Sequence, residues 1–337
     1  MAKAPQKKTV RLTAAEATVR YLAAQYVEVD GEELPLFAGI FAIFGHGNVA
    51  GLGPVLHAYR KQLPTLRAHN EQAMAHAAIA FAKANARRRM MACTTSIGPG
   101  ATNMVTAAAV AHVNRLPVLF LPGDVFAGRR PDPVLQQVED FGDATASAND
   151  CFRPVSRFWD RITRPEQLLI SLPAALRVLT DPVNCGPVTL AFPQDVQTES
   201  CRFPESFFAR KVHRLRRPAP DKDQLASVVA ALKASKRPLI IAGGGVKYSL
   251  AEKSLAAFAD RFGIPVAETQ AGKGSLAWNH FRNVGSIGVT GSAAANELAA
   301  GADAILSVGS RLGDFTTGSR TAFDETRLIG LNVGDFD

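Results

Sequence analysis

The sequence has no apolar run of about 18 residues, the length that a membrane-spanning helix requires, so we expect no transmembrane segment. Its N-terminal segment is charged and lacks the apolar core of a secretory signal, so none is expected. Cysteine is scarce, and Cys93, Cys151, Cys185 and Cys201 lie far apart without a CxxC pair. This spacing favours reduced thiols in a cytoplasmic protein over a disulfide framework or a zinc site.

Aromatic residues are also few, at 7%, and no basic stripe with interleaved aromatics occurs, so nucleic-acid binding is not expected. The net charge of +8 arises largely from local clusters. One is the N-terminal tail with Lys3, Lys7, Lys8 and Arg11, and another is the arginine run 87–89. We expect the arginine run at the C-terminus of a helix, where cations suit the helix dipole.

Between about residues 36 and 192, short apolar runs alternate with amphipathic helical stretches. Such alternation indicates βαβ units and therefore a parallel sheet covered by helices on both faces. The predicted strands are LFAGIFAIF (36–44), LPTLRA (63–68), RMMACTT (89–95), LPVLFLPG (116–123), FRPVSRF (152–158) and GPVTLAFP (186–193). We therefore predict a doubly wound α/β domain over residues 1–197.

Residues 198–222 are rich in proline, arginine and charge without a clear period, so the sequence predicts a linker there. A second α/β pattern follows over 223–337. Its predicted strands are RPLIIA (237–242), IPVAET (264–269), ADAILSVGS (302–310) and TRLIGLNV (326–333). Because the last strand runs almost to residue 337 and a parallel sheet needs covering helices, we expect this second, Rossmann-like domain to be incomplete.

Candidate ligand-binding residues gather after the predicted strands of the first domain. In parallel α/β sheets, ligands bind beyond the carboxyl ends of the strands, in the loops that follow them. Four such loops contain unusual residues: GHGN (45–48), AHNEQ (68–72), TTSIGPGATN (94–103) and PGDVFAG (122–128). We expect these loops to converge on one crevice.

Glu71 is the leading candidate, because it is a single acid at the start of a predicted helix whose next residues are nearly all apolar. The pattern predicts a buried helix, and burial suits a carboxyl group to hold or donate a proton near neutral pH. A plain N-terminal helix acid, stabilised by the helix dipole, is the alternative. His69 and His76 flank it, but HNEQAMAH lacks the HExxH spacing of a zinc site, so we assign no metal ligand.

Two glycine-containing segments could approach a ligand with their backbone. GPGATN (98–103) permits a tight turn and ends on the polar Asn103, although it could equally be a simple helix start. GGG (243–245) follows a strand and could bind phosphate. Tyr248 stands where GxGxxG needs its third glycine, so the dinucleotide signal is weak, and FAD binding is left open.

Taken together, these segments resemble the thiamine-diphosphate enzymes of the acetohydroxyacid synthase superfamily over about residues 15–337. The resemblance rests on RAHNEQAMAHAAIAFAKA (67–84), SIGPGATNMVTAAAVAHVNRLPVLFLPGD (96–124), GPVTLAFPQDVQ (186–197), RPLIIAGGGVKYS (237–249) and ADAILSVGSRLGDFTTGS (302–319). Within the superfamily, GHGNVAGLG, QQVEDF, NDCFRPVSRFWDRI and VAETQAGKGSL are most similar to the trihydroxycyclohexane-dione hydrolase branch. GHGN (45–48) departs from the GxPG-type sequence of acetohydroxyacid synthases, which argues against simple pyruvate condensation.

The resemblance implies a PYR domain that binds the aminopyrimidine of thiamine diphosphate, followed by a central domain. The family's third domain, called PP, holds the diphosphate through Mg²⁺ with a GDG segment, which does not occur in this sequence. We therefore expect the chain to lack that domain and its metal ligands, and to be inactive alone. The resemblance also implies a homodimer or homotetramer.

The resemblance assigns Glu71 the catalytic role, because the family's glutamate at this position bonds N1′ of the aminopyrimidine and shares a proton there. It places Gly45, Pro99, Gly100 and Asn103 beside Glu71 in cofactor binding.

We expect His46, Asn48 and Gln137 to meet the hydroxyl or ketone groups of a cyclic substrate, with a cap of the glycine-bounded loop as the alternative for Asn48. The implied reaction is carbon–carbon hydrolysis that opens a trihydroxycyclohexane-1,2-dione to 5-deoxy-glucuronate in myo-inositol catabolism. A carboligase like acetohydroxyacid synthase, or a non-catalytic half of a split or degenerate enzyme, is the alternative.

Overall fold

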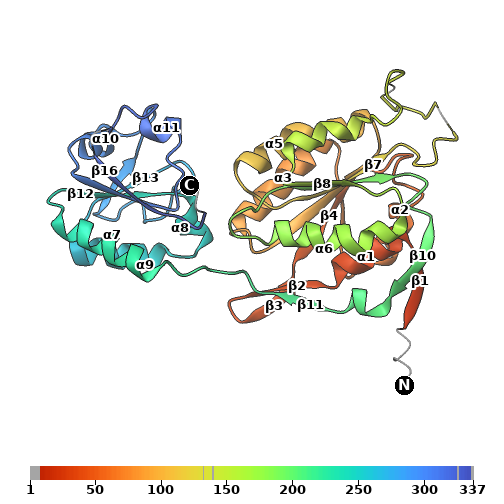
Figure 1. The fold of residues 1–337 in the computed structure, drawn as a ribbon, viewed down its shortest axis with the longest axis horizontal. Coiled ribbons are helices and arrows are strands. Elements are labelled where there is room, and N and C mark those ends of the chain that lie inside the picture. The colour runs from red at the N-terminus through yellow and green to blue at the C-terminus, as the bar shows by residue number, and fades with distance from the viewer. Residues whose placement is uncertain (1–7, 132, 139, 325, 335–337) are drawn as a thin grey trace. The chain divides into compact units, whose positions relative to one another are not determined.

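The computed structural model describes residues 8–131, 133–138, 140–324 and 326–334, and the chain forms two compact units, residues 1–216 and 217–337 (Figure 1). Each unit is built on a parallel sheet with helices, which confirms the predicted α/β class. Lys3 and Lys7 of the basic tail lie outside the described residues. Among the described residues, no helix combines the length and the apolar character needed to cross a membrane.

The main sheet of the first unit has six parallel strands in the order β5-β4-β6-β7-β9-β8. Their bounds are Phe37–Ala42 (β4), Thr65–Arg67 (β5), Met90–Thr95 (β6), Leu119–Asp124 (β7), Phe158–Arg161 (β8) and Val188–Pro193 (β9). Every residue of β6, β7 and β9 is buried. Strands that are covered on both faces consist of nearly unbroken apolar runs. This pattern made the central strands predictable from the sequence.

Helices cover both faces of this sheet (Figure 1). Helices α1, α2 and α6 pack together, while α3 and α5 contact each other on the other side. The bounds are Ala14–Ala23 (α1), Leu52–Ala58 (α2), Glu71–Ala84 (α3), Pro99–Thr102 (α4), Val105–Val113 (α5) and Leu168–Leu179 (α6). Arg87, Arg88 and Arg89 follow the end of α3, as predicted from their charge.

The predicted linker begins with regular structure that sequence patterns did not indicate. Within 198–222, β10 (Ser200–Pro204) pairs antiparallel with β1 (Thr9–Thr13), and β11 (Lys211–His213) joins β2 (Gln25–Val29) in a sheet with β3 (Glu32–Pro35). Regular structure is absent only from 198–199, 209–210 and 214–221 of this stretch. Short strands that pair with distant partners have too few residues to show a period, so composition alone was misleading.

The strand predicted over 152–158 is also shifted. Residues Ala148–Val155 form a 3₁₀ helix, and the strand β8 begins only at Phe158. Ser147 starts the helix with a capping box, in which its hydroxyl and the carboxylate of Asp150 each bond the other's backbone N–H. Local hydrogen bonding therefore outweighs the apolar pattern of this stretch.

The second unit has a five-stranded parallel sheet in the order β14-β13-β12-β15-β16. The strands are Pro238–Ala242 (β12), Val266–Glu268 (β13), Asn283–Ser286 (β14), Ala304–Val308 (β15) and Arg327–Leu331 (β16). The helices are Lys222–Ala234 (α7), Gly244–Tyr248 (α8), Glu252–Phe262 (α9), Ala293–Ala300 (α10) and Asp314–Thr317 (α11). Two buried apolar clusters form its core.

The triple glycine 243–245 serves the packing of this second sheet. The N–H of Gly243 donates to the carbonyl of Val308 at 2.8 Å, and the N–H of Gly245 donates to that of Gly309 at 2.9 Å. A Cβ atom on Gly309 would lie 2.5 Å from Gly245 Cα, so two loops meet backbone to backbone. These two N–H groups are therefore committed to the protein, and the glycines provide close loop packing.

We predict that Gly309→Ala destabilises the second unit by about 2–4 kcal/mol, because Gly309 has a φ of +63° and its new methyl group would collide with Gly245. Gly313→Ala is the matched control, since nothing lies within 4 Å of its Cβ position. Hydrogen exchange during urea unfolding measures the effect in β12 and β15. Equal stability of the two variants would contradict the packing role.

Candidate functional site

Three of the four predicted loops meet at the carboxyl ends of neighbouring strands. A Cβ atom on Gly45 would lie 2.7 Å from Ser96 Oγ, and one on Gly47 would lie 2.6 Å from Ile97 Cγ2. A Cβ on Gly123 would lie 2.6 Å from the carbonyl oxygen of Gly47. Because each contact is too close for any side chain, the glycines allow the loops after β4, β6 and β7 to touch.

The fourth loop reaches the same place through Glu71, the first residue of α3. The Asn103 side chain donates from Nδ2 to Glu71 Oε2 at 2.7 Å. Asn70 caps the helix, because its side chain accepts from the N–H of Ala73 at 2.8 Å. The structure thus brings Glu71 and Asn103 together, as their predicted shared site requires.

The prediction that α3 is buried is wrong for the described structure. Met74, Ala75 and Ala78 face the core, but Ala73 and Ala77 are exposed, and Glu71 is half-buried. Small alanine side chains gave a nearly continuous apolar pattern that does not distinguish a covered face from an open one. Burial of the helix therefore does not support the proton transfer expected of Glu71, and the hydrogen bond to Asn103 has to support it instead.

The space beside Glu71 is kept open by Gly100. A Cβ atom at Gly100 would lie 3.5 Å from Glu71 Oε1 and 2.9 Å from Thr95 Oγ1. The hydroxyl of Thr95 is buried and has no hydrogen-bond partner among the described residues. Pro99 opens α4 directly before Gly100, where a proline is compatible with helix geometry.

His46 and Gln137 lie near the same loops because the segment 134–138 passes over them. The carbonyl of Leu135 accepts a 2.8 Å hydrogen bond from His46, so Nε2 of that ring must have its proton. A Cβ atom on Gly98 would lie only 1.9 Å from the carbonyl oxygen of Gln136. Gln137 is half-buried and donates to the carbonyl of Val138 at 3.0 Å.

Asn48 has the structural role that the sequence left as its alternative. Its side chain is 1% exposed, and Oδ1 accepts from the N–H of Gly45 at 3.0 Å. Its Nδ2 donates to the carbonyl of Ile43 at 3.1 Å and to Thr94 Oγ1 at 3.2 Å. With both N–H groups used, Asn48 caps the loop from inside, and the predicted substrate contact is not supported.

Gln197 holds this loop in place and was not singled out from the sequence. Its side chain is 1% exposed, and Nε2 donates to the carbonyls of Gly47 at 2.7 Å and Phe192 at 2.9 Å. Its Oε1 accepts from the N–H of Leu52 at 3.2 Å. The segment PQDVQ (193–197) places polar residues directly after a predicted strand. This pattern does not reveal that the partner of Gln197 lies 150 residues away, at Gly47.

Asp195 anchors the next loop from the same turn. Its two carboxylate oxygens accept from the N–H groups of Ala127 and Gly128, each at 2.9 Å. One turn after β9 therefore fixes both the loop that contains His46 and the loop that follows β7.

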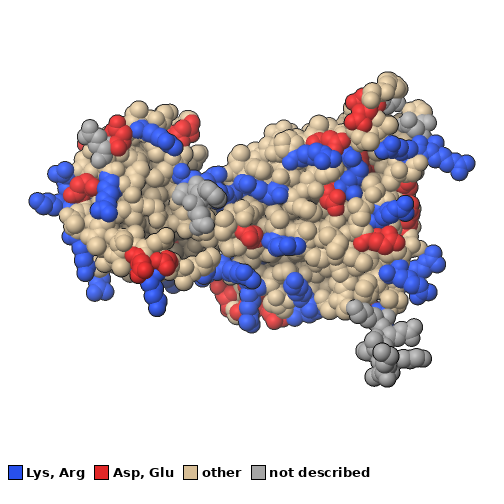
Figure 2. Space-filling view, viewed as in Figure 1, with Lys and Arg blue, Asp and Glu red and all other residues tan. Residues whose placement is uncertain are grey.

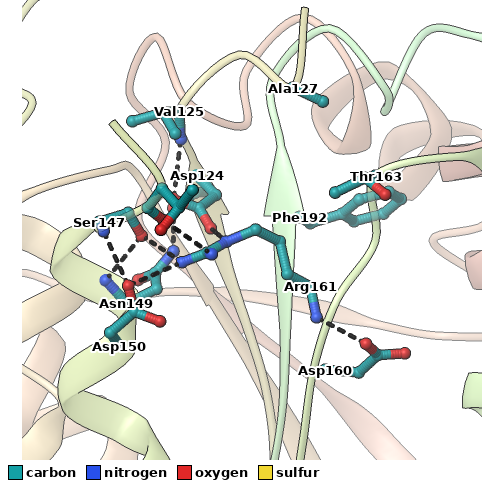
Figure 3. Close-up of polar contacts among 12 residues, drawn as sticks. Asp124, Val125, Ala127, Ser147, Asn149, Asp150, Asp160, Arg161, Thr163 and Phe192 are labelled. Carbon is teal, nitrogen blue, oxygen red and sulfur yellow. Dashed lines mark hydrogen bonds and ion pairs between the residues drawn. The ribbon is translucent and has the colours of Figure 1, made fainter. Parts of the chain in front are cut away.

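An ion-pair network holds the ends of β7 and β8 together (Figure 3). Asp124 is 1% exposed, and Arg161 Nε contacts its Oδ2 at 2.8 Å. Arg161 Nη2 also donates to Ser147 Oγ at 2.8 Å and to Asp150 Oδ2 at 3.1 Å, and Nη1 donates to the carbonyl of Thr145 at 3.3 Å. The network therefore links Asp124, which precedes the segment 134–138 in the chain, to Thr145, Ser147 and Asp150, which follow it.

The charges in this network support one another. Burial acts to lower the pKa of Arg161, but Asp124 and Asp150 outweigh it and hold that pKa above its ordinary value. Burial acts to raise the pKa of Asp150, but hydrogen bonds from Arg153, Ser147 N–H and Arg161 lower it overall. The stabilisation from Asp150 is therefore present above the pKa of an unfolded aspartate and is lost as pH falls through its depressed value.

In the described part of the chain, no three His, Cys, Asp or Glu side chains gather into a group that could hold a metal ion. His76 lies 3.5 Å from Gln72 Nε2 within α3. Of the cofactor residues predicted from the sequence, Asn103 bonds Glu71 and Gly100 lies beside it, whereas Gly45 packs against Ser96, three residues before Pro99.

Comparison with known proteins identifies two domains. The sequence matches the N-terminal TPP binding domain of thiamine pyrophosphate enzymes over residues 12–144. It matches the central domain of thiamine pyrophosphate enzymes over residues 225–335.

The chain is similar to several proteins named 3D-(3,5/4)-trihydroxycyclohexane-1,2-dione hydrolase. It is 52% identical over 328 residues to that of Geobacillus thermodenitrificans (strain NG80-2), and 51% identical over 330 residues to that of Clostridium tetani (strain Massachusetts / E88). Each alignment covers 97% of this chain and 51% of the relative, so the chain spans about half the length of the curated relatives it matches. The chain belongs to the thiamine pyrophosphate enzyme family, of which it contains the N-terminal and central domains.

Proposed function

We propose that this chain supplies the pyrimidine-binding half of a thiamine-diphosphate-dependent hydrolase that cleaves a carbon–carbon bond. The proposed reaction opens a 3D-trihydroxycyclohexane-1,2-dione to 5-deoxy-glucuronate in myo-inositol catabolism. The observation that carries the proposal is the carboxylate of Glu71, oriented by Asn103 beside the gap that Gly100 leaves. The similarity to hydrolases of this name, at 51–52% identity over 97% of the chain, supports the substrate class.

The residues around Glu71 fit the aminopyrimidine half of the cofactor. A side chain at Gly100 would approach both Glu71 Oε1 and the hydroxyl of Thr95, which has no hydrogen-bond partner in the described part of the chain, so glycine leaves room for a flat ring there. Gly45 would contribute its backbone, and Pro99 its ring, to the surface around the bound aminopyrimidine. When bound, thiamine diphosphate supplies an electron sink for carbon–carbon cleavage next to a carbonyl.

Glu71 would hold or give up a proton at N1′ of that ring. A carboxyl group is suited to this task because it can be a donor or an acceptor according to its protonation. Its partner in the structure is a neutral amide, so the hydrogen bond orients the acid without an ion pair. Glu71 would thus be a proton-transfer group whose carboxylate is already oriented by Asn103 before any ligand binds.

His46 and Gln137 are the proposed contacts to the substrate. Because Nε2 of His46 donates to Leu135, a neutral ring leaves Nδ1 as an acceptor for a substrate hydroxyl. Gln137 uses Nε2 on the Val138 carbonyl, which leaves Oε1 to accept in the same way. Acceptors of this kind suit a polyhydroxylated ring.

The wider assignment is part of the same proposal. Mg²⁺ would be held by residues outside this chain, the assembly would be a homodimer or homotetramer, and the location would be cytoplasmic. Four free thiols, two of them buried, support a reducing compartment. Sedimentation analysis of the purified protein tests the assembly.

We predict that Glu71→Gln in the complete enzyme lowers kcat by about 10²–10⁴-fold, because glutamine cannot exchange a proton with N1′. Glu252→Gln is the matched control, since Glu252 is also the first residue of a helix but lies in the second unit. The assay follows release of 5-deoxy-glucuronate from the dione with thiamine diphosphate and Mg²⁺ present.

Full activity of Glu71→Gln would refute the catalytic role. Turnover of pyruvate to acetolactate instead of the dione would identify a carboligase. Failure of the folded, cofactor-loaded wild-type protein to act on either substrate would favour a non-catalytic half.

We predict that His46→Ala lowers kcat/KM for the dione by about 3–10-fold, the loss expected for one hydrogen bond to the substrate. His57→Ala is the control, because His57 is exposed on α2, outside the site. Steady-state kinetics with the dione measures both variants. An equal kcat/KM in His46→Ala and wild type would remove His46 from the substrate site.

A further inference from the structure

We infer that Asn103 is a positioning residue for Glu71: its amide fixes one carboxylate oxygen, so that the other faces the gap above Gly100. This inference rests on the proposed function of Glu71 and differs from the cofactor contact expected of Asn103. The two residues lie 32 positions apart, on different elements, and their side chains meet at 2.7 Å. This distance lies at the short end of the range for N–H···O hydrogen bonds.

The position of Asn103 is itself well fixed. Asn103 ends the short helix α4, and its backbone N–H donates to the carbonyl of Pro99 at 3.0 Å. Ala101 within this turn and Met104 directly after Asn103 are 0% exposed, so they anchor the turn to the core. A side chain on a turn anchored in this way can restrain a longer and more flexible one, and Glu71 is the longer of the pair.

The two oxygens of Glu71 have different surroundings. Oε2 accepts from Asn103, whereas Oε1 lies 3.5 Å from the position that a Cβ on Gly100 would occupy. Positions 100 and 103 are three residues apart, which places them on the same side of a helical turn. The turn 100–103 therefore has two effects: Asn103 orients the carboxylate, and Gly100 leaves space beside its Oε1 atom.

The choice of an amide has a chemical reason. An arginine or lysine at position 103 would hold Glu71 equally well, but its charge would favour the ionised carboxylate and oppose return of a proton. Asn103 donates a hydrogen bond without a net charge, so it orients Glu71 without adding an ion pair. Asn103 thereby orients the carboxylate, and Glu71 transfers the proton.

The ligand-free protein provides the first test, by NMR of the asparagine side-chain amides. We expect the Asn103 amide signal to shift in Glu71→Gln, because its acceptor changes from a carboxylate to a neutral amide. Asn114 is the control: its Nδ2 donates to the backbone carbonyl of Val110 at 2.9 Å, and its signal should not move. An Asn103 signal that is the same in wild type and Glu71→Gln would overturn the inference.

The second test is a double-mutant cycle in the complete enzyme, with Asn103→Leu and Glu71→Gln, measuring kcat and the Kd of thiamine diphosphate. We expect Asn103→Leu to lower kcat by about 10–100-fold when Glu71 is present, because misplacing a catalytic group costs rate. In the Glu71→Gln background, the same change should cost less than about 2-fold. Asn103→Gln, which keeps the amide donor, should recover part of the loss.

Equal effects of Asn103→Leu on Kd in both backgrounds would show a direct cofactor contact and overturn the positioning role. If Glu71→Gln alone leaves kcat unchanged, the proposed function fails instead. The NMR comparison then still decides whether Asn103 holds Glu71.

Discussion

The candidate site depends most on the buried side-chain amide of Gln197. That one group bonds three backbone groups, two of them in the stretch from Gly47 to Leu52, and removal of it would leave buried polar atoms without partners. Two residues earlier, Asp195 holds the loop after β7 in the same manner. A single turn after β9 thus holds both the loop after β4, which contains His46, and the loop after β7.

Two carboxylates at the carboxyl ends of the first sheet have opposite partners. Asp124 is buried against Arg161, which neutralises it and ties the ends of two strands together. Such a pair is costly to break, because the remaining charge would stay buried alone. Glu71 instead receives a neutral amide and is only half-buried. The contrast separates an acid that ties two strand ends together from the acid for which we propose a role in proton transfer.

The sheet was predictable because strands buried on both faces form apolar runs in the sequence. The helix that begins at Glu71 was predictable because a polar cap precedes its apolar residues. The pairing of Glu71 with Asn103 was within reach, since parallel strands bring successive loops to one edge. Other features depend on partners far along the chain. The capping role of Asn48, the hold of Gln197 on Gly47 and the pair Arg161–Asp124 each need the folded arrangement. The exposed face of α3 was missed because alanine is common in both covered and open positions.

The span between Gly47 and Gln197 has a consequence for how the protein is made. Their hydrogen bond closes a loop of 150 residues, which is among the slower kinds of contact to form. A chain emerging from the ribosome contains the complete GHGN and GPGATN segments long before residue 197 leaves the exit tunnel. The loop after β4 therefore acquires its final geometry late, after β9 has entered the sheet, and a nascent chain arrested earlier contains GHGN without the side chain of Gln197 that holds it.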